Sequence, residues 1–418
     1  MNSALPTLPD FAKRMDPAHI VDLDLVDDST RQQALRGTVA EWAKRPPFYT
    51  RRTSVWVTVC SRAADVREMF TSPDRFSVEA PAYEGYKVFD IFGGLENVLQ
   101  MEGERHDRIR RLMNPAFTPQ AVMRMSADID RIIAEKVDHV AGLDGRFDAV
   151  KDFCHDIIVR VMLDASFKLT PAQQQAFIKM HDSISLATQF KPGEAWPAEF
   201  MQAVQEVTEI ISQVVAERRA NPGDDMISNL VTATDEGRGM TESELFGQIN
   251  SICSAGIGTT ASTLAGALLM LGRHPDQLQA LRDNPELVDG AVEESLRCHG
   301  PGFITFTRFA TRDTELGGVP VFKDMPVVAS IQAADFDPDE FPEPLAFDIR
   351  RNPKGIFAFG AGPHHCIGNR MARMVLRKAL MALINRFPNL RLADPDFEPV
   401  YGGFPGELSM TSLPMRFD

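Results

Sequence analysis

The sequence lacks the cysteine pattern of a disulfide-bonded or zinc-binding protein. Its cysteines are odd in number, widely spaced and never arranged as CxxC: Cys60, Cys154, Cys253, Cys298 and Cys366. This usage is typical of a reducing compartment, where disulfides are rare. Four of the five are expected to be small, buried apolar side chains.

Basic residues are scarce relative to acidic ones. The chain has 44 Lys and Arg against 58 Asp and Glu, a net charge of −14. A nucleic-acid-binding protein needs basic residues to neutralise phosphates, so this class is not expected. Residues 1–17, MNSALPTLPDFAKRMDP, contain no basic region followed by an apolar run. Neither a secretory signal nor a membrane anchor is therefore predicted, and we expect a cytoplasmic protein.

Internal boundaries are also lacking. The 418 residues, 44% of them hydrophobic, are enough for two or three domains by length alone. No Ser/Gly linker, charge block, low-complexity tract or fixed-period repeat divides them. A single domain spanning residues 1–418 is the simpler prediction.

Most of the chain has the hydrophobic period of helices, with a small β contribution. Residues 54–61, SVWVTVCS, alternate as a strand does and precede a helical pattern at 62–72. A second strand pattern lies in residues 318–332, where Pro320 and Pro326 are expected to restrict strands to turns and sheet edges. The fold is predicted to be mainly α with a minor β part.

The longest helical pattern begins at the capping box T-E-S-E, residues 241–244, and continues to Pro275. A helix of about 30 residues would be roughly 45 to 50 Å long and could cross a whole domain. A membrane-spanning helix is the alternative, because the segment is apolar. Its polar residues weigh against that alternative. They are Gln248, Asn250, Ser251, Ser254, Thr259, Thr260, Ser262 and Thr263.

Residues 357–370, FAFGAGPHHCIGNR, place Cys366 in a glycine-rich loop. A zinc site would need a second Cys/His cluster, and a nucleophilic cysteine would need a base that no motif identifies. A buried cysteine on a turn is the plainest alternative. A single axial thiolate ligand to a haem needs only one cysteine and a loop that lets the sulfur approach the iron.

The residues around Cys366 suit the haem alternative. Gly360, Gly362 and Gly368 permit backbone conformations that other residues resist and leave amides free to donate towards the sulfur. Residues 367–387 have helical character, so a thiolate here would lie at a helix amino terminus, where negative charge is favoured.

The loop resembles the cysteine-ligand signature of the cytochrome P-450 haem-thiolate monooxygenases, soluble bacterial type. The matching residues are Phe359, Gly360, Gly362, His364, Cys366, Gly368 and Ala372. The resemblance implies a single large helical domain that encloses haem b, with the Cys366 thiolate as axial ligand and a long central helix over the distal face. It also implies that Phe359, Gly360 and Gly368 contribute to cofactor binding.

Two further motifs agree with this resemblance. Glu294 and Arg297 match the family's ExxR pair, which holds the core on the haem-proximal side. Taken alone, the pair would be an exposed helical ion pair worth a few tenths of a kcal/mol. The family also uses a histidine and an arginine four residues apart on haem propionates. The residues implied to bind the propionates here are His106, Arg110, Arg308 and His364. Alone, each would be read as solvated surface.

The third motif, AGIGTT at residues 255–260, departs from the family pattern. Ala255, Gly256 and Thr259 match, but Gly258 stands where an acidic residue usually relays protons. The structural alternative is that small residues merely allow close helix packing. The resemblance assigns catalytic roles to Gly256, Gly258 and Thr259, with Thr259 hydrogen-bonding to dioxygen. Protons would then arrive through water or a substrate group.

The implied function is insertion of one oxygen atom from dioxygen into a hydrophobic small molecule. The chain has no GxGxxG fingerprint or flavin segment, so electrons are expected from a ferredoxin and its NAD(P)H-dependent reductase. The predicted partner-docking residues are Arg370, Arg373, Arg377 and Lys378. The predicted substrate contacts are Ala255, Phe303, Ile304 and Phe404. The alternatives are peroxide-driven oxidation, oxidative coupling or reduction in the same fold, prompted by Gly258, and a non-catalytic haem sensor.

Overall fold

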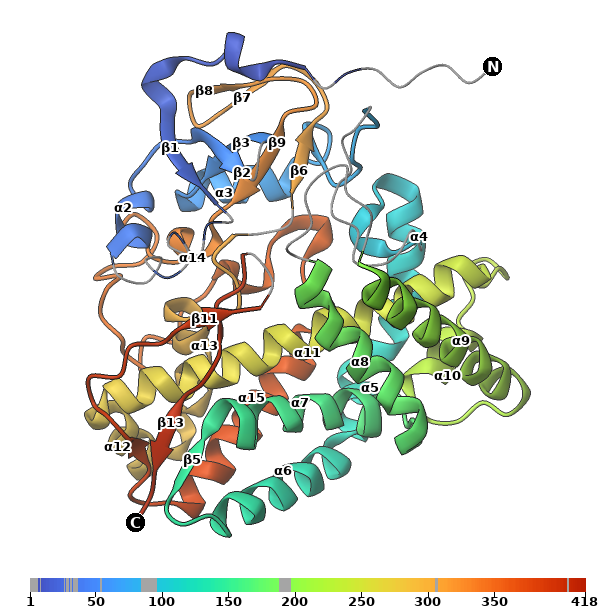
Figure 1. Ribbon diagram of the computed structural model, residues 1–418, viewed down its shortest axis with the longest axis vertical. Coiled ribbons are helices and arrows are strands. Elements are labelled where there is room, and N and C mark those ends of the chain that lie inside the picture. Colours follow the sequence, from blue (N-terminus) through green and yellow to red (C-terminus); the bar gives the residue numbers. More distant parts are fainter. Residues whose placement is uncertain are drawn as a thin grey trace.

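The computed structural model describes residues 7, 9–25, 27, 30, 32, 37–52, 55–83, 96–187, 197–304, 307–403 and 406–418. Helices dominate this part of the chain, as predicted (Figure 1). The helices are α2 (Val39–Trp42), α3 (Ala63–Thr71), α4 (Gly103–Met113), α5 (Pro119–Arg124), α6 (Ser126–Ala141), α7 (His155–Arg160), α8 (Pro171–Ala187), α9 (Ala198–Ala220), α10 (Met226–Thr232), α11 (Glu242–Arg273), α12 (Pro275–Asp283), α13 (Val288–Cys298), α14 (Ile331–Ala334) and α15 (Asn369–Arg386).

The strands form one larger sheet and several small ones, and Figure 1 shows the larger sheet at the top of the view, away from most of the helices. Its strand order is β1-β2-β3-β9-β6-β4, and the smaller sheets are β10-β13-β5, β11-β12 and β7-β8. The strands are β1 (Ile20–Asp24), β2 (Phe48–Arg52), β3 (Val55–Cys60), β4 (Phe76–Ser77), β5 (Arg146–Asp148), β6 (Arg308–Ala310), β7 (Thr314–Leu316), β8 (Val319–Val321), β9 (Pro326–Ala329), β10 (Arg391–Leu392), β11 (Tyr401–Gly402), β12 (Ser409–Met410) and β13 (Pro414–Arg416).

The strand predictions are confirmed, with one correction. The first predicted strand is β3, followed directly by α3, and the second pattern contains β8 and β9. Pro320 lies in the small β7-β8 hairpin, but Pro326 begins β9, which lies inside the larger sheet between β3 and β6. The expectation that Pro326 would restrict its strand to an edge was wrong. A proline is tolerated there because it is the first residue of the strand, where its missing N–H interrupts the pairing least.

The long apolar helix is α11, and it is a core helix. The Thr241 hydroxyl accepts from the Glu244 amide at 3.2 Å while the Glu244 carboxylate accepts from the Thr241 amide at 2.8 Å, which confirms the capping box. α11 is about 48 Å long at 1.5 Å per residue and packs against α7, α13 and α15. Among the described residues it is the one helix long and apolar enough to cross a membrane, but 67% of its most apolar stretch is buried inside the protein.

α15 follows the cysteine loop and turns its apolar face inward. Met371, Val375 and Ala379 are buried, and Ala382 is partly buried. The start of α15 therefore lies close to α11, which fixes the cysteine loop opposite the middle of the long helix.

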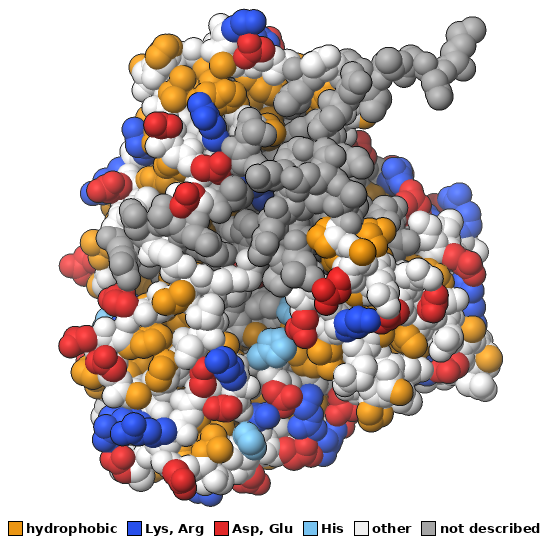
Figure 2. Space-filling view, in the orientation of Figure 1, with side chains coloured by type: hydrophobic (Ala, Val, Ile, Leu, Met, Phe, Trp, Pro, Cys, Tyr) orange, Lys and Arg blue, Asp and Glu red, His pale blue; other side chains and the backbone are white. Residues whose placement is uncertain are grey.

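Charged side chains of both signs alternate over the face of the molecule shown in Figure 2. Ion pairs also link neighbouring helices, such as Lys179 with Glu206 at 2.8 Å and Arg219 with Glu242 at 3.1 Å.

Candidate functional site

A cavity of about 670 Å³ separates the middle of α11 from the cysteine loop and the start of α15. This volume lies within the range of sites that enclose small ligands and cofactors, roughly 300 to 1,000 Å³. Cys366 lines one wall, and Ala255, Gly258 and Thr259 line the opposite wall. The structure thus brings together two motifs that lie more than a hundred residues apart in the sequence.

Glycines shape the cysteine loop at two positions. Gly360 has φ +66° and Gly362 has φ +69°, a region that residues with a Cβ rarely adopt. A Cβ on Gly362 would also lie 2.3 Å from the Phe70 carbonyl oxygen. Gly368 differs from the expectation, because its φ of −80° is ordinary and suits any residue. The Cys366 amide donates to the Phe359 carbonyl at 2.9 Å and closes the loop.

The Cys366 sulfur lies near two guanidinium groups at the cavity wall. Burial raises the pKa of the Cys366 thiol above its ordinary value, although the Gly368 and Asn369 amides and the Arg110 and Arg373 guanidinium groups act in the opposite direction. The other four cysteines are buried, and burial also raises the pKa of each, to about 12 for Cys298. Cys366 is the one of the five that lines the cavity, so its sulfur is the one that can meet a cofactor there.

The zinc alternative has no support in the described part of the chain. No group of three or more His, Cys, Asp or Glu side chains there could hold a metal ion. His365 points away from a shared site, because its ring is exposed and lies against Phe359 with ring centroids 6.5 Å apart. A single sulfur ligand remains the metal chemistry that the loop can provide.

Cationic and imidazole groups from three separate segments converge at one edge of the cavity. Arg110, Arg308 and His364 line it, and the His106 ring lies 4.3 Å from the His364 ring. The carboxylate between them is Glu102, whose Oε2 lies 3.3 Å from His364 Nε2. Burial raises the pKa of Glu102, but the His364 hydrogen bond, the Val78 amide and the neighbouring charges lower it overall.

This edge has more donors than acceptors. Arg308 is only 7% exposed, and burial lowers its pKa to about 10 despite the attraction of Glu102. The buried Nε2 of His106 has no hydrogen-bond partner among the described residues. Two buried or half-buried guanidinium groups and an unpartnered imidazole nitrogen fit the paired carboxylates of haem, which accept bidentate hydrogen bonds from arginine. The residues present therefore fit the expected cofactor.

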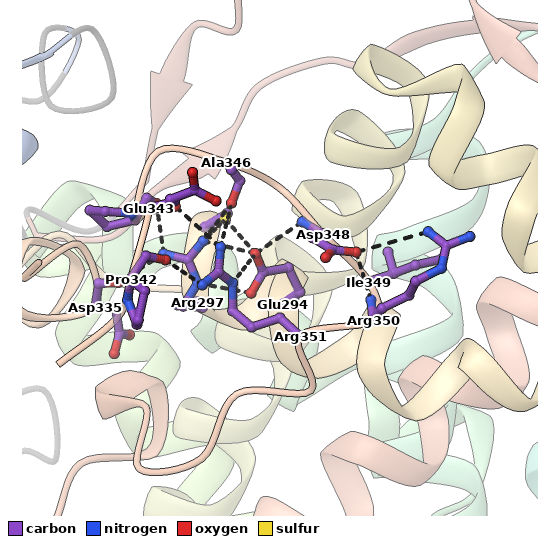
Figure 3. Close-up of polar contacts among 12 residues, drawn as sticks. Glu294, Arg297, Asp335, Pro342, Glu343, Ala346, Asp348, Ile349, Arg350 and Arg351 are labelled. Carbon is purple, nitrogen blue, oxygen red and sulfur yellow. Dashed lines mark hydrogen bonds and ion pairs between the residues drawn. The ribbon is translucent and has the colours of Figure 1, made fainter.

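The Glu294 and Arg297 pair on α13 is buried, not exposed, and Figure 3 shows its polar contacts. Both side chains are 0% exposed, and two hydrogen bonds of 2.8 Å join them. Arg297 also donates to the carbonyl oxygens of Asp335, Pro344 and Ala346 at 2.8 to 3.0 Å. Glu294 accepts in addition from Arg351 and from the Asp348 amide, both at 3.1 Å. The pair therefore fastens α13 to the segment from Asp335 to Arg351, which precedes the cysteine loop.

The distal wall of the cavity is the face of α11 that carries Ala255, Gly258 and Thr259. The Thr259 hydroxyl donates to the Ala255 carbonyl at 2.7 Å, so its one hydrogen is committed to the helix. Gly256 faces Met162, whose Cε would lie 2.3 Å from a Cβ at that position. Gly256 therefore allows a close approach between α11 and the segment after α7, in agreement with the packing alternative.

Only some of the predicted substrate contacts line the cavity. Ala255 and Ile304 line the cavity. Phe303 is fully buried against Trp42, with ring centroids 5.2 Å apart, and does not line the cavity. The expectation that Phe303 contacts substrate therefore finds no support, because the backbone turns this side chain towards α2. Phe404 lies outside the described residues.

The predicted partner-docking face is largely engaged in ion pairs within the chain. Arg373 bonds to Glu293 and lies over the Phe359 ring, 4.2 Å from its centroid. Arg377 pairs with Asp289 at 2.6 Å and Lys378 pairs with Asp130. Arg370 is exposed. The spacing of basic residues on one helix was visible in the sequence, but their acidic partners on α13 and α6 were not.

Several cavity residues escaped the sequence prediction, among them the titratable side chains of His155 on α7, His181 on α8 and Glu407 before β12. No motif marks them, because they come from segments with no regular spacing. The glycine at position 258 was the available signal, since it implied that another group occupies the space of the missing side chain.

Comparisons with known proteins agree with this geometry. The Cytochrome P450 family model matches residues 44–415. The chain is 33% identical over 353 residues to Cytochrome P450 CYP107DY1 of Priestia megaterium, covering 84% of each protein. It is 32% identical to 6-deoxyerythronolide B hydroxylase of Saccharopolyspora erythraea, over 82% of this chain and 83% of that protein. The solved structure of Cytochrome P450 CYP109Q5 from Chondromyces apiculatus aligns with a TM-score of 0.83 and 27% identity, covering 95% of this chain and 98% of that one. The chain therefore belongs to the cytochrome P450 family and is an oxidoreductase of the P450 monooxygenase class.

Proposed function

We propose that this enzyme holds haem b through the Cys366 thiolate and inserts one atom of dioxygen into a hydrophobic small molecule. The observation that carries this proposal is the placement of Cys366 and Thr259 on opposite walls of one cavity whose edge carries Arg110, Arg308 and His364. The coarser part of the conclusion rests on the family, whose members bind haem through a cysteine thiolate.

The chain would hold the cofactor at two places. The sulfur of Cys366 would bind the iron, and its negative charge would be stabilised by the Gly368 and Asn369 amides. Arg110, Arg308, His106 and His364 would bind the propionates at the cavity edge. Haem bound through a thiolate supplies an electron-rich iron that favours cleavage of the O–O bond and oxidation of unactivated C–H bonds.

The residues of α11 would control protons and water on the distal side. The Thr259 hydroxyl donates to the Ala255 carbonyl, so its oxygen can accept a hydrogen bond but must rotate before it can donate one. A hydroxyl that accepts from one side and donates to the other can pass a proton. We infer that Thr259 takes this role at the distal wall.

We propose a hydrophobic small molecule as substrate. Ala255, Ile304 and Met410 give the cavity apolar walls, and apolar walls with few polar groups suit a large hydrophobic compound. Relatives at 30 to 32% identity carry names such as Steroid C26-monooxygenase, Epothilone C/D epoxidase and 6-deoxyerythronolide B hydroxylase. Those names belong to the relatives, and they support a hydrophobic substrate class here.

We propose that the two electrons come from a ferredoxin that is reduced by an NAD(P)H-dependent reductase. The sequence contains no nucleotide-binding or flavin segment of its own. Arg370 is the exposed member of the predicted docking face and would steer an acidic partner towards the start of α15. We also propose a cytoplasmic enzyme whose whole chain forms one domain, with no nucleic-acid or membrane partner.

A second candidate keeps the fold but changes the oxidant. Gly258 lines the cavity in place of the usual acid, and this missing proton donor is the observation that supports peroxide-driven oxidation, oxidative coupling or reduction. Turnover with ferredoxin, reductase and oxygen should be compared with turnover with added peroxide alone. Product that forms only with peroxide would select this second candidate. The haem-sensor alternative has no support, because the relatives are named as enzymes.

The test of the proposed ligand is the spectrum of the reduced protein with carbon monoxide. Thiolate ligation should give the strongly red-shifted band of the parent protein. Cys366→Ala should lose this band, and Cys253→Ala, a buried cysteine of α11 outside the cavity, should keep it. A red-shifted band in Cys366→Ala would contradict the proposal.

A further inference from the structure

The side of α11 at Gly258 faces two titratable groups from distant parts of the chain. A Cβ on Gly258 would lie 3.6 Å from His181 Cε1, and 3.7 and 3.9 Å from the two carboxylate oxygens of Glu407. A side chain at position 258 would therefore point directly between an imidazole and a carboxylate. The carboxylate missing from α11 is thus matched by one that reaches the same space from another segment.

The two groups come from different elements and lie close together. His181 belongs to α8 and Glu407 lies in the segment between β11 and β12. Each comes within 4 Å of the same point beside Gly258, so these atoms of the two side chains are less than 8 Å apart. Glu407 accepts a hydrogen bond from Ser409 Oγ at 3.0 Å. Both side chains line the cavity together with Thr259.

His181 is placed to exchange a proton. Its Nδ1 is buried and has no hydrogen-bond partner among the described residues. Burial and the neighbouring His155, with ring centroids 5.8 Å apart, lower the pKa of His181, while Asp182 acts to raise it. A largely neutral imidazole has one nitrogen that accepts and one that donates, so it can take a proton on one side and release it on the other.

We propose that Glu407 and His181 together replace the acid missing at Gly258 and deliver protons to the Thr259 side of the cavity. This inference rests on the proposed function. For a substrate RH the reaction is RH + O₂ + 2 e⁻ + 2 H⁺ → ROH + H₂O, with the electrons supplied by the ferredoxin. Each proton that the pair releases into the cavity is replaced by one from water, so the pair is unchanged after a turnover.

Asp182, the residue after His181, connects the cavity with the solvent-exposed side of α8. A hollow of about 850 Å³ lies between α8 and α9, and Asp182 lines both this hollow and the inner cavity. Asp182 is exposed, and His181 beside it is half-buried. Protons from bulk water can therefore reach His181 through the carboxylate next to it. The titratable groups that face His181 are Asp182 on its own helix, His155 on α7 and Glu407.

A cavity carboxylate could instead bind an amino group of the substrate. The position of Glu407 favours proton delivery, because its oxygens lie against α11 next to Thr259 and beside an imidazole. Binding of an amino group would need the carboxylate to face the apolar walls. The two roles predict different results, since a relay controls the fate of the electrons and a recognition site controls affinity.

The decisive experiment moves the carboxylate. Glu407→Gln keeps the size and removes the acid, and Gly258→Asp in the Glu407→Gln background returns a carboxylate to the same space from α11. We measure product formed per reductant consumed, with released peroxide followed in parallel. We expect Glu407→Gln and His181→Gln each to lower this fraction by roughly fivefold or more, within the range of general acid–base groups, and the relocated Asp to restore most of it.

Two controls accompany this series. Glu286→Gln, an exposed carboxylate that does not line the cavity, should leave the fraction unchanged. Gly258→Asp alone adds a second carboxylate whose Cβ would lie within 4 Å of the Glu407 oxygens, and neighbouring like charges oppose ionisation of both, so it should help less than in the Glu407→Gln background. If Glu407→Gln does not fold, His181→Gln still tests the relay through the same measurement.

A second readout does not depend on turnover. The pKa of His181 can be followed by NMR of ¹³C-labelled histidine in the reduced, carbon monoxide-bound protein, with the signal assigned by its absence in His181→Gln. A carboxylate nearby favours the charged imidazole. We therefore expect the pKa of His181 to fall in Glu407→Gln and to rise again when Asp is added at position 258.

The outcomes separate the two proposals. Unchanged coupling in Glu407→Gln and His181→Gln, in an enzyme that turns over with oxygen, overturns the relay alone. Weaker substrate binding with unchanged coupling also overturns it and assigns Glu407 to recognition. An unmoved pKa of His181 removes the interaction on which the relay depends. A parent that lacks oxygen-dependent turnover sinks the proposed function, and the relay with it.

Discussion

Replacing Arg297 with leucine should nearly abolish stable folding, because its guanidinium group is the hub of a buried network. The variant would leave the carbonyl oxygens of Asp335 and Pro344 without their guanidinium donor, and Ala346 with only a longer bond from Arg351. It would also remove the fully buried partner of Glu294, which would keep Arg351 and the Asp348 amide as donors. An unsatisfied buried acceptor costs about 1 to 3 kcal/mol, and breaking a buried ion pair about 3 to 5 kcal/mol.

These contributions do not add strictly, but two orphaned acceptors and the broken pair together amount to about 5 kcal/mol at the lower end of these ranges, against a typical total stability of ~5 to 15 kcal/mol. The measurement is the urea midpoint by circular dichroism, together with soluble yield. Arg131→Leu is the matched control, because Arg131 pairs with Glu135 on an exposed helix face with both side chains about half exposed. It should cost less than ~1 kcal/mol. If Arg297→Leu unfolds within ~1 kcal/mol of the parent, the network does not carry the stability assigned to it.

Three further predictions concern separate parts of the molecule. His299 is fully buried, and burial lowers its pKa from 6.5 to about 4. As the pH falls, His299 is protonated in the unfolded chain before it is protonated in the folded one, so the free energy of unfolding should fall by up to ~3 kcal/mol between pH 6.5 and pH 4. His299→Gln should flatten the change in urea midpoint over this range. An equally steep loss in the variant would show that His299 is not its cause. Arg370→Glu should slow reduction by a ferredoxin and weaken the dependence of this rate on ionic strength. Arg373→Glu should also lower the thermal midpoint, because it breaks contacts with Glu293 and Phe359. The measurement is stopped-flow reduction at several salt concentrations, and a parent-like rate in Arg370→Glu would remove this residue from the docking face. Ile304→Ala should change the spectral shift and the affinity for ligands that bind the parent, because Ile304 lines the cavity. Phe303→Ala should lower stability without a direct effect on binding, because Phe303 is buried outside the cavity. Unchanged ligand binding in Ile304→Ala would exclude this contact.

The sequence predicted the elements that local patterns encode. The capping box and period of α11, the alternation of β3 and the apolar face of α15 depend on neighbouring residues, so they were visible without a structure. The cysteine loop was recognisable because its glycines and Cys366 lie within the nine residues 360–368. In these parts of the fold and site, the residues that interact are also close together in the sequence.

The parts that escaped prediction depend on contacts between distant segments. The Glu294 and Arg297 pair has the spacing of an exposed ion pair, and its burial depends on the segment from Asp335 to Arg351. Arg373 is one of a row of basic residues, but its Glu293 partner lies on another helix. Glu407 reaches Gly258 from a segment almost 150 residues away. No local pattern reports such encounters.

The order of strands in the larger sheet has a consequence for synthesis of the chain. β3 pairs on one side with β2, but its other neighbour, β9, follows about 270 residues later, with Thr58 opposite Val327. At a synthesis rate of roughly 5 to 20 residues per second, β3 waits about 15 to 50 s for this partner. Its open edge, VWVTVC, is rich in β-branched residues and able to pair with other chains in the meantime. We therefore expect the nascent protein to depend on chaperones that cover this edge until β9 has been synthesised.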